Sequence, residues 1–359
     1  MALVGKEGNP GSEAKEGVMR RRRLALAWAA AALVTLTGHA LAATTPQPTA
    51  PPVPASAGHL VQGPREILWP AGSPAAGERH AHEGSQQLIY GGGVNGVGVE
   101  HHPSVYIVFW GSQWRSNDPY ASYEQRFFRG LYGPGDTWTG LQREWCDHIP
   151  KGAVSCPQRA PRVGAPYGGL VKGVWFDNSR LAIPTDNPVV RGLPDAVAQE
   201  AVRAAAHFGN RSGAKNRDVV YLINEPSRFD SLGYGALYCG YHSVVGSNYG
   251  LIPYADLPYL TDIGFQCGQN YVNRGSAGTY DGVSLVAGHE YIESITDPYV
   301  LTGWADQEGE ENADKCIWKA TGEGAMTNVR LSTGTFAVQG SWSNLANNGN
   351  GGCVNHVGR

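Results

Sequence analysis

An apolar segment that carries three ionisable residues in its middle constrains the fold of this chain more than any other feature. It runs from Val283 to Pro298 and reads VSLVAGHEYIESITDP. Its apolar positions are frequent enough to predict a mostly buried helix that ends at Pro298, with Asp281 as the N-terminal cap. A buried charge needs a partner, so the fold must bring compensating groups to this helix.

The ionisable residues of the segment, His289, Glu290 and Glu293, form a metal-binding pattern. Residues four apart lie on one helix face, about 6 Å along the axis, so His289 and Glu293 are predicted metal ligands. Glu290 lies about 100° around the helix and is predicted to be the general base that takes a proton from the attacking water. The alternative is two exposed helix carboxylates beside a hydrogen-bonded core histidine.

An acidic segment downstream offers a third ligand. Glu311 follows Glu293 by 18 residues, and Asp314 lies three residues later, so a short helical turn would point both to one side. We predict Glu311 as the third ligand and Asp314 as the hydrogen-bond partner of the free ring nitrogen of His289. The spacing of His289 and Glu293 is that of a zinc hydrolase helix, so Zn²⁺ is the predicted ion, although the oxygen-rich donor set is also compatible with Ca²⁺ or Mn²⁺.

Four further residues are candidates for supporting roles. Asp297 and Asp306 are predicted to support the ligands from outside, and the alternative for Asp297 is a turn at the helix end. Tyr241 and His242 are candidates to polarise a substrate carbonyl and stabilise an oxyanion. The alternative for these two is packing within a strand.

The N-terminus predicts export. Residues 1–42 contain a run of arginines, an apolar stretch and the cleavage pattern Ala40-Leu41-Ala42, which is typical of a signal peptide; Met19 is a possible true start. Residues 43–86 are rich in Pro, Ala and Gly and are predicted to be a disordered or extended linker or pro-region. Residues 87–359 are then one secreted domain with no membrane span.

The composition of the chain limits the classes of binding partner that we expect and predicts its disulfide bonds. Charged residues make up 16% of the chain and the net charge is −3, which gives no reason to expect nucleic acid or an anionic membrane as partner. We expect a monomer that acts on an extracellular protein or peptide. Six cysteines in an exported chain predict three disulfides; they allow 15 pairings, of which the simplest is sequential: Cys146–Cys156, Cys239–Cys267 and Cys316–Cys353.

The remaining elements give an α+β order with a mixed sheet. Strands are predicted at 104–110, 170–176 and 218–224, helices at 122–131 and 195–208, and a hairpin at 237–245 and 250–254. With the buried helix they predict a disulfide-stabilised, zincin-like metallohydrolase domain. The exposed edge of the hairpin would receive an extended peptide by strand addition.

Three short blocks carry a resemblance to known proteins. Residues 289–298, 303–306 and 311–316 resemble the H-E-x-x-E-x-x-T-D-P, G-W-x-D and E-x-x-D-x-C blocks of secreted bacterial proteins and, more distantly, of the plant EXORDIUM (phosphate-induced) proteins. The likeness extends over most of residues 100–353. The arrangement is also similar to the gluzincin metallopeptidases, except that Glu293 stands where those enzymes have a second histidine. The resemblance implies a zincin-like fold and a zinc active site.

We therefore expect a secreted metal-dependent hydrolase, and within that class a zinc endopeptidase. One alternative is a non-catalytic extracellular protein associated with the cell wall or with glycans, in which the acidic cluster binds a structural cation. Another is a glycosidase that places Glu290 and Glu311 across a cleft.

Overall fold

The computed structural model describes residues 53–73, 87–179, 195–229 and 238–356, all of which belong to the second of two compact units, Gln47–Arg359. The predicted signal peptide, residues 1–42, lies outside the described residues, as do 43–52 and 74–86 of the predicted linker. Within the described ranges, no helix is both long and apolar enough to cross a membrane.

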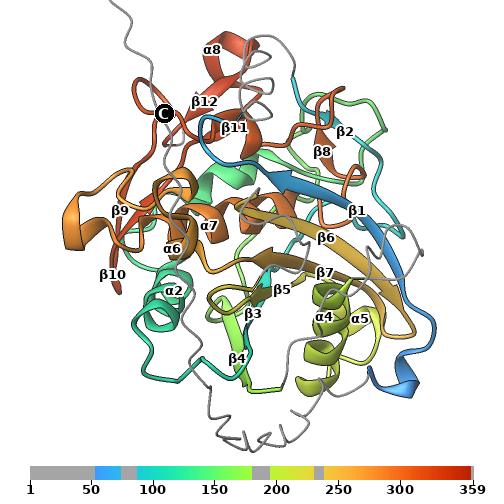
Figure 1. Cartoon of the computed structure of the whole chain (residues 1–359). Helices are drawn as coiled ribbons and strands as arrows, with labels where there is room; N and C mark the ends of the chain where they lie inside the picture. Colours follow the sequence, from blue (N-terminus) through green and yellow to red (C-terminus); the bar gives the residue numbers. More distant parts are fainter. Residues whose placement is uncertain (1–52, 74–86, 180–194, 230–237, 357–359) are drawn as a thin grey trace, which may run out of the picture. The chain divides into compact units, whose positions relative to one another are not determined.

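A six-stranded mixed sheet forms the centre of the unit, in the order β1-β6-β7-β5-β3-β4 (Figure 1). Neighbours among β7, β5, β3 and β4 are parallel, whereas β6 is antiparallel to both β7 and β1. The strands are β1 (Val61–Leu68), β3 (Ser104–Trp110), β4 (Val171–Asp177), β5 (Val219–Asn224), β6 (Gly240–Ser247) and β7 (Gly250–Leu257).

Apolar side chains pack on both faces of this sheet, which explains why β3 and β5 read as continuous apolar runs. One face packs against α2 (Pro119–Gly130) and α7 (Asp281–Thr296), and the other against α4 (Ala196–His207). Neighbouring residues of β3 divide accordingly: Phe109 lies in the core with α7, and Trp110 in the core with α4.

Short elements complete the unit. The hairpin of β9 (Thr327–Leu331) and β10 (Gly334–Val338) packs on α7. The other pieces are η1 (Ala55–Ala57), β2 (Ile89–Tyr90), η2 (Thr139–Glu144), α5 (Gly213–Asn216), α6 (Leu260–Ile263), η3 (Gly264–Cys267), η4 (Gly275–Gly278), β8 (Trp304–Ala305), η5 (Asp314–Cys316), β11 (Ser341–Ser343), α8 (Ala346–Gly349) and β12 (Gly352–Val354).

The predicted combination of helices with a mixed sheet is observed, and so is the buried helix, α7. The zincin-like identity of the fold stays a prediction.

The predicted cap of α7 is wrong. Asp281 is the first residue inside the helix, and its carboxylate accepts the backbone N–H groups of Val272 and Asn273 at 3.0 and 2.6 Å. Asp281 therefore fastens the preceding loop to the start of α7.

The sheet begins earlier in the chain than predicted. Residues 61–68, which the sequence placed in a linker or pro-region, form β1 and pair with β6. Arg65 donates to Asp195 at 2.6 Å, which ties β1 to the start of α4. The strand β6 is therefore an interior strand, so the free hairpin edge predicted to receive a peptide is covered by β1.

Three disulfides link Cys146 to Cys156, Cys239 to Cys267 and Cys316 to Cys353, which is the sequential pairing predicted above. Their Cα–Cα distances of 5.4–5.9 Å lie in the ordinary range. The second bridge ties the residue before β6 to η3, and the third ties the acidic segment to the C-terminal strand β12. Each would contribute about 2–4 kcal/mol to stability.

A buried acid in α2 gives the fold a pH-dependent stability. Glu124 is fully buried beneath the sheet and accepts a hydrogen bond from Asn224 at 3.0 Å, and burial raises its pKa to about 8. The folded protein therefore keeps a proton on Glu124 that the unfolded chain releases near pH 4.3. The stability from this proton is complete below that pH, falls as pH rises and is gone above about 8.

We expect Glu124→Gln to remove this dependence, because the amide is neutral and still accepts from Asn224. Between pH 5 and 8, wild type should lose stability relative to the variant by up to about 1.4 kcal/mol per pH unit. Urea unfolding at several pH values measures the difference, with Glu323→Gln as a control on an exposed glutamate. A constant difference between wild type and Glu124→Gln would show that Glu124 is ionised in the folded protein.

Candidate metal centre

The centre lies between α7 and β6, where a glycine lets the helix approach the strand. The helix α7 is buried along its whole length, and its residues His289, Glu290 and Glu293 are at most 1% exposed. A Cβ atom added to Gly240 at the start of β6 would lie 2.7 Å from Glu290 Oε1 and 3.0 Å from Val286 Cγ1. A larger residue at position 240 would therefore displace Glu290.

Three side chains form what we call the His289 group: His289, Glu293 and Asp314. The ring atom His289 Nε2 lies 3.1 Å from Glu293 Oε1 and 3.5 Å from Asp314 Oδ1. The backbone N–H of Asp314 donates to Glu293 Oε1 at 3.0 Å, which fixes the acidic segment against α7. Their donor atoms all lie within 4.8 Å of one another, so the group could hold a metal ion.

A second set, the His242 group, consists of His242, Glu293 and Glu311. The atom His242 Nε2 lies 3.2 Å from Glu311 Oε1 and 3.6 Å from Glu293 Oε2. These donor atoms also lie within 4.8 Å of one another. The two groups share Glu293, which presents one oxygen to each histidine. We refer to both groups together with Glu290 as the cluster.

The structure thus redistributes the predicted ligands. His289 and Glu293 meet as expected, but Glu311 meets Glu293 beside His242 rather than beside His289. Asp314 was predicted to bind the outer ring nitrogen of His289, yet it faces Nε2, the same nitrogen that Glu293 faces. His242, predicted to polarise a substrate, takes a position suited to a ligand.

Several polar atoms of the cluster have no hydrogen-bond partner despite complete burial. They are both carboxylate oxygens of Glu290, one oxygen each of Glu293 and Glu311, and His289 Nε2, which is close to its carboxylates without hydrogen-bond geometry. An orphaned buried polar atom costs about 1–3 kcal/mol, and more when charged. Cations bound by the two groups would satisfy the orphaned atoms of Glu293, Glu311 and His289, so these residues fit a metal site.

The pKa values of the cluster residues, in the absence of a cation, reflect their burial and their closeness to one another. Burial and the charge of Asp314 raise the pKa of Glu293 to about 7, and burial raises the pKa of Glu290 well above its usual value. Burial alone would lower the pKa of His289, but the charge of Glu293 raises it well above the usual range. Burial lowers the pKa of His242 to about 3 and keeps its ring neutral, as a metal ligand must be.

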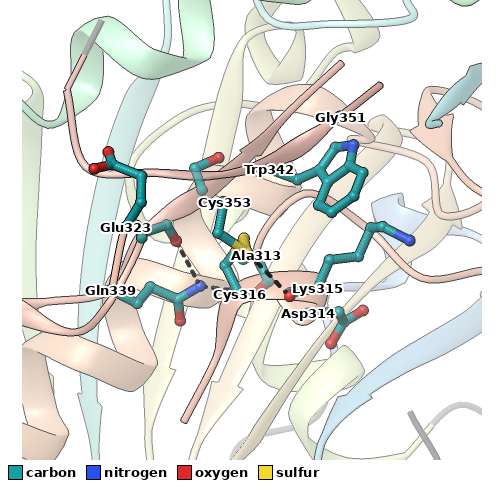
Figure 2. Close-up of a disulfide and its surroundings, with 12 residues drawn as sticks. Ala313, Asp314, Lys315, Cys316, Glu323, Gln339, Trp342, Gly351 and Cys353 are labelled. Carbon is teal, nitrogen blue, oxygen red and sulfur yellow. Dashed lines mark hydrogen bonds between the residues drawn. A yellow bond between two sulfur atoms is a disulfide. The ribbon is translucent and has the colours of Figure 1, made fainter. Parts of the chain in front are cut away.

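Gln339 orients the His289 ring, a role that the sequence did not reveal. Its Oε1 lies 3.0 Å from His289 Nδ1, and its amide nitrogen donates to the backbone oxygen of Ala313 at 2.8 Å. Figure 2 shows Gln339 and Ala313 among the residues around the disulfide between Cys316 and Cys353. Because Gln339 accepts from Nδ1, it orients the ring with Nε2 toward Glu293 and Asp314.

Replacing Gln339 with Leu should weaken metal binding by about 10–100-fold, the usual effect of losing the group that orients a histidine ligand. Competition with a chromophoric chelator measures the affinity. The matched control is Gln307→Leu at an exposed position. An unchanged affinity in Gln339→Leu would show that His289 needs no such orientation.

The disulfide between Cys316 and Cys353 holds the acidic segment in place (Figure 2). Lys315 stacks over Trp342, 4.6 Å from the ring centre, and pairs with Asp306 at 2.6 Å. The segment that carries Glu311 and Asp314 is thereby fixed at its C-terminal end, so these carboxylates need little ordering to bind a metal.

Tyr241 was predicted to belong to the site, and this prediction is wrong. Successive strand residues point to opposite faces of a sheet, so Tyr241 lies on the side of α4 whereas His242 faces α7. The Tyr241 hydroxyl donates to Asp195 Oδ2 at 2.8 Å, far from the chemistry proposed for it. Tyr241 packs the other face of the sheet.

The two aspartates that were predicted to support the metal ligands occupy different positions. Asp297, at the end of α7, accepts three backbone N–H groups of the following turn, and its charge adds to the burial that raises the pKa of Glu311. Asp297 is therefore both a turn former and a neighbour of the His242 group. Asp306 instead forms the buried ion pair with Lys315 and contacts neither group among the described residues.

A third set of possible ligands lies apart from the cluster. Asp147 Oδ1 is 2.9 Å from His101 Nε2 and 2.8 Å from His148 Nδ1, and Asp147 Oδ2 accepts the backbone N–H of Gly98. His148 is half exposed, and both carboxylate oxygens of Asp147 are satisfied. This set is complete as a hydrogen-bonded ion pair and does not call for a cation.

The cluster is closed to solvent within the part of the chain that the structure describes, because its members are at most 3% exposed. Surface pockets of about 380 and 510 Å³ lie beside Tyr90 and beside Trp342, and no member of the cluster lines either of them. Comparison with protein-family models, with curated proteins and with solved structures gave no match for this chain. The cluster itself is therefore the basis for proposing a function.

Proposed function

We propose that the protein is a secreted metal-dependent hydrolase that acts on peptide bonds, with zinc as the preferred ion. The observation that supports this most is the Glu290 carboxylate, which is fully buried and has no hydrogen-bond partner beside two sets of imidazole and carboxylate donors. Three disulfides suit an oxidising, extracellular location.

The residues of the cluster have different roles in the proposed hydrolysis. The His289 and His242 groups would hold the metal, which would supply Lewis acidity toward a carbonyl and lower the pKa of a water molecule. Glu290 belongs to neither group and is the general base that accepts the proton of the attacking water. Burial raises the pKa of Glu290, which favours its uptake of a proton from the attacking water. Glu290 then passes the proton to the leaving amine.

The substrate would bind along β6, at the edge that β1 occupies. In the register between these strands, Glu66 lies opposite His242 and Leu68 opposite Gly240. Residues paired in register lie on the same face of the sheet, so Glu66 faces the cluster as His242 does. Burial raises the pKa of Glu311, and the negative charge of Glu66 raises it further. A peptide that replaced β1 would pass beside Glu290 and His242, so the form with β1 in place is latent.

The test is a chain with a specific protease site inserted between Gly72 and Ser73, in a turn where a Cβ atom added to Gly72 would meet no atom within 4 Å. We expect cutting, followed by dissociation of β1, to raise hydrolysis of an unstructured protein substrate at least tenfold. The gain should vanish on chelation and return with Zn²⁺. Cut chain that has released β1, carries metal and still hydrolyses nothing would reject the hydrolase proposal.

A structural cation site in a non-catalytic extracellular protein is the second candidate. The complete burial of the cluster favours it, because catalytic metals keep a position open to substrate whereas structural metals are enclosed. This candidate predicts that chelation lowers the melting temperature while no form of the chain hydrolyses peptides. The experiment with released β1 separates the two candidates.

A further inference from the structure

The donors of the cluster fall into two groups that meet at one carboxylate. Glu293 Oε1 faces His289 and Asp314, whereas Glu293 Oε2 faces His242. We propose that the cluster is a dinuclear site in which Glu293 bridges two divalent cations, one held by His289 and Asp314 and the other by His242 and Glu311. This inference rests on the proposed metal-dependent function, because it states how many ions that function uses.

The distances within each group match a single coordination sphere. Tetrahedral ligands about 2.1 Å from an ion lie roughly 3.4 Å from one another. In the His289 group the two distances from the ring nitrogen are 3.1 and 3.5 Å, and in the His242 group they are 3.2 and 3.6 Å. In each group both distances from the ring nitrogen therefore fit neighbouring ligands of one tetrahedral ion.

One ion does not gather all five donors. Ligand atoms on a common ion can be no farther apart than twice the bond length, about 4.2 Å. Among the described residues, no set of donors within even 4.8 Å of one another contains both His242 and His289. Carboxylate-bridged pairs of metals lie about 3.5–4 Å apart, a spacing that two groups sharing one carboxylate can provide.

Charge also favours two cations. The cluster buries four carboxylates, those of Glu290, Glu293, Glu311 and Asp314. In the part of the chain that the structure describes, Glu293 and Glu311 form ion pairs with histidines alone, and Glu290 forms none. Two divalent cations balance these four negative charges, whereas one cation would leave an excess of two in a buried site, where unpaired charge is costly.

The buried polar atoms without hydrogen-bond partners lie in both groups. A single ion in one group would therefore leave the atoms of the other group unsatisfied. His289 Nε2 belongs to the His289 group, and Glu311 Oε2 to the His242 group. Glu293 Oε2, the oxygen turned toward His242, is orphaned as well. An ion in each group satisfies the two ends of the cluster and the bridge between them.

The experiment loads chelator-treated full chain with Mn²⁺, counts bound ions by elemental analysis and records the electron paramagnetic resonance spectrum. We expect two Mn²⁺ per chain with a spin-coupled spectrum. Asp314→Asn and Glu311→Gln should each retain one ion with an uncoupled spectrum, and Glu293→Gln should lose at least tenfold affinity for both. Glu323→Gln is the matched control on an exposed carboxylate and should retain two coupled ions.

One ion with an uncoupled spectrum in wild type would overturn the proposal without needing any variant to fold. Two ions of which His148→Ala loses one would also overturn it, since that ion would sit at the separate His101, Asp147 and His148 set. Metal count and activity separate this proposal from the hydrolase proposal. One ion with peptide hydrolysis leaves only the hydrolase standing, and two coupled ions without hydrolysis leave only the dinuclear site.

Discussion

Replacing Glu290 with Gln will reduce hydrolysis by the chain freed of β1 by about 10²–10⁴-fold, the usual contribution of a general base. The amide has nearly the same shape but cannot accept a proton. Metal content will remain at the wild-type level, because Glu290 belongs to neither the His289 group nor the His242 group. The measurement is kcat on an unstructured protein substrate together with elemental analysis of the same sample.

The matched control for this variant is Glu323→Gln, which makes the same chemical change on an exposed side chain and should leave kcat unchanged. Full activity in Glu290→Gln would remove Glu290 from the reaction. Loss of the metal along with the activity would make Glu290 a ligand instead of a base. Only lost activity with retained metal supports the proposed role.

Removing the metal will lower the melting temperature of the intact chain by on the order of 10 °C. The cluster concentrates carboxylates between α7 and β6, and an unpaired buried charge is strongly destabilising. Binding to the folded state at a ligand concentration of 1,000 Kd contributes about 4 kcal/mol. A thermal melt with and without chelator, at fixed pH, measures the shift.

The variant Glu293→Gln separates loss of metal from other effects of the chelator. It removes the carboxylate that both groups share, so it should melt lower than wild type and show no further change on chelation. Disulfides remain intact in both samples, which keeps the covalent framework constant. A wild-type chain that loses its metal but keeps its melting temperature would contradict a stabilising cation.

Local signals in the sequence were sufficient for the central elements. Continuous apolar runs bounded by Gly or polar residues predicted β3 and β5, which are buried on both faces. The density of apolar residues around His289 predicted the buried helix α7, and helical spacing placed Glu293 beside His289. These features depend on residues close together in the chain.

The strand β1 was not predicted because its sequence has a low propensity to form a strand. It contains Gly63 and Pro64 followed by two charged residues, and the register with β6 is irregular between Gln62 and Arg65. Proline and glycine are tolerated at the edge of a sheet, where the partner strand supplies the pairing. Only the tertiary structure shows that β6 needs this partner.

The distribution of ligands between the two groups also depends on contacts distant in sequence. Gln339 follows His289 by 50 residues, and His242 precedes Glu311 by 69. Nothing near either residue indicates the partner. The separation of Tyr241 from His242, by contrast, was predictable, because adjacent residues of a strand point to opposite faces.

The most direct test of the buried metal centre is anomalous X-ray diffraction from crystals of the chain purified without chelator or added metal. We predict anomalous density at the absorption edge of a divalent metal, about 2.0–2.2 Å from Glu293 and from the ring nitrogens of His242 and His289. Two peaks about 3.5–4 Å apart would place an ion in each group. Absence of anomalous density at any metal edge, with the carboxyl groups hydrogen-bonded to one another or to water, would contradict the account.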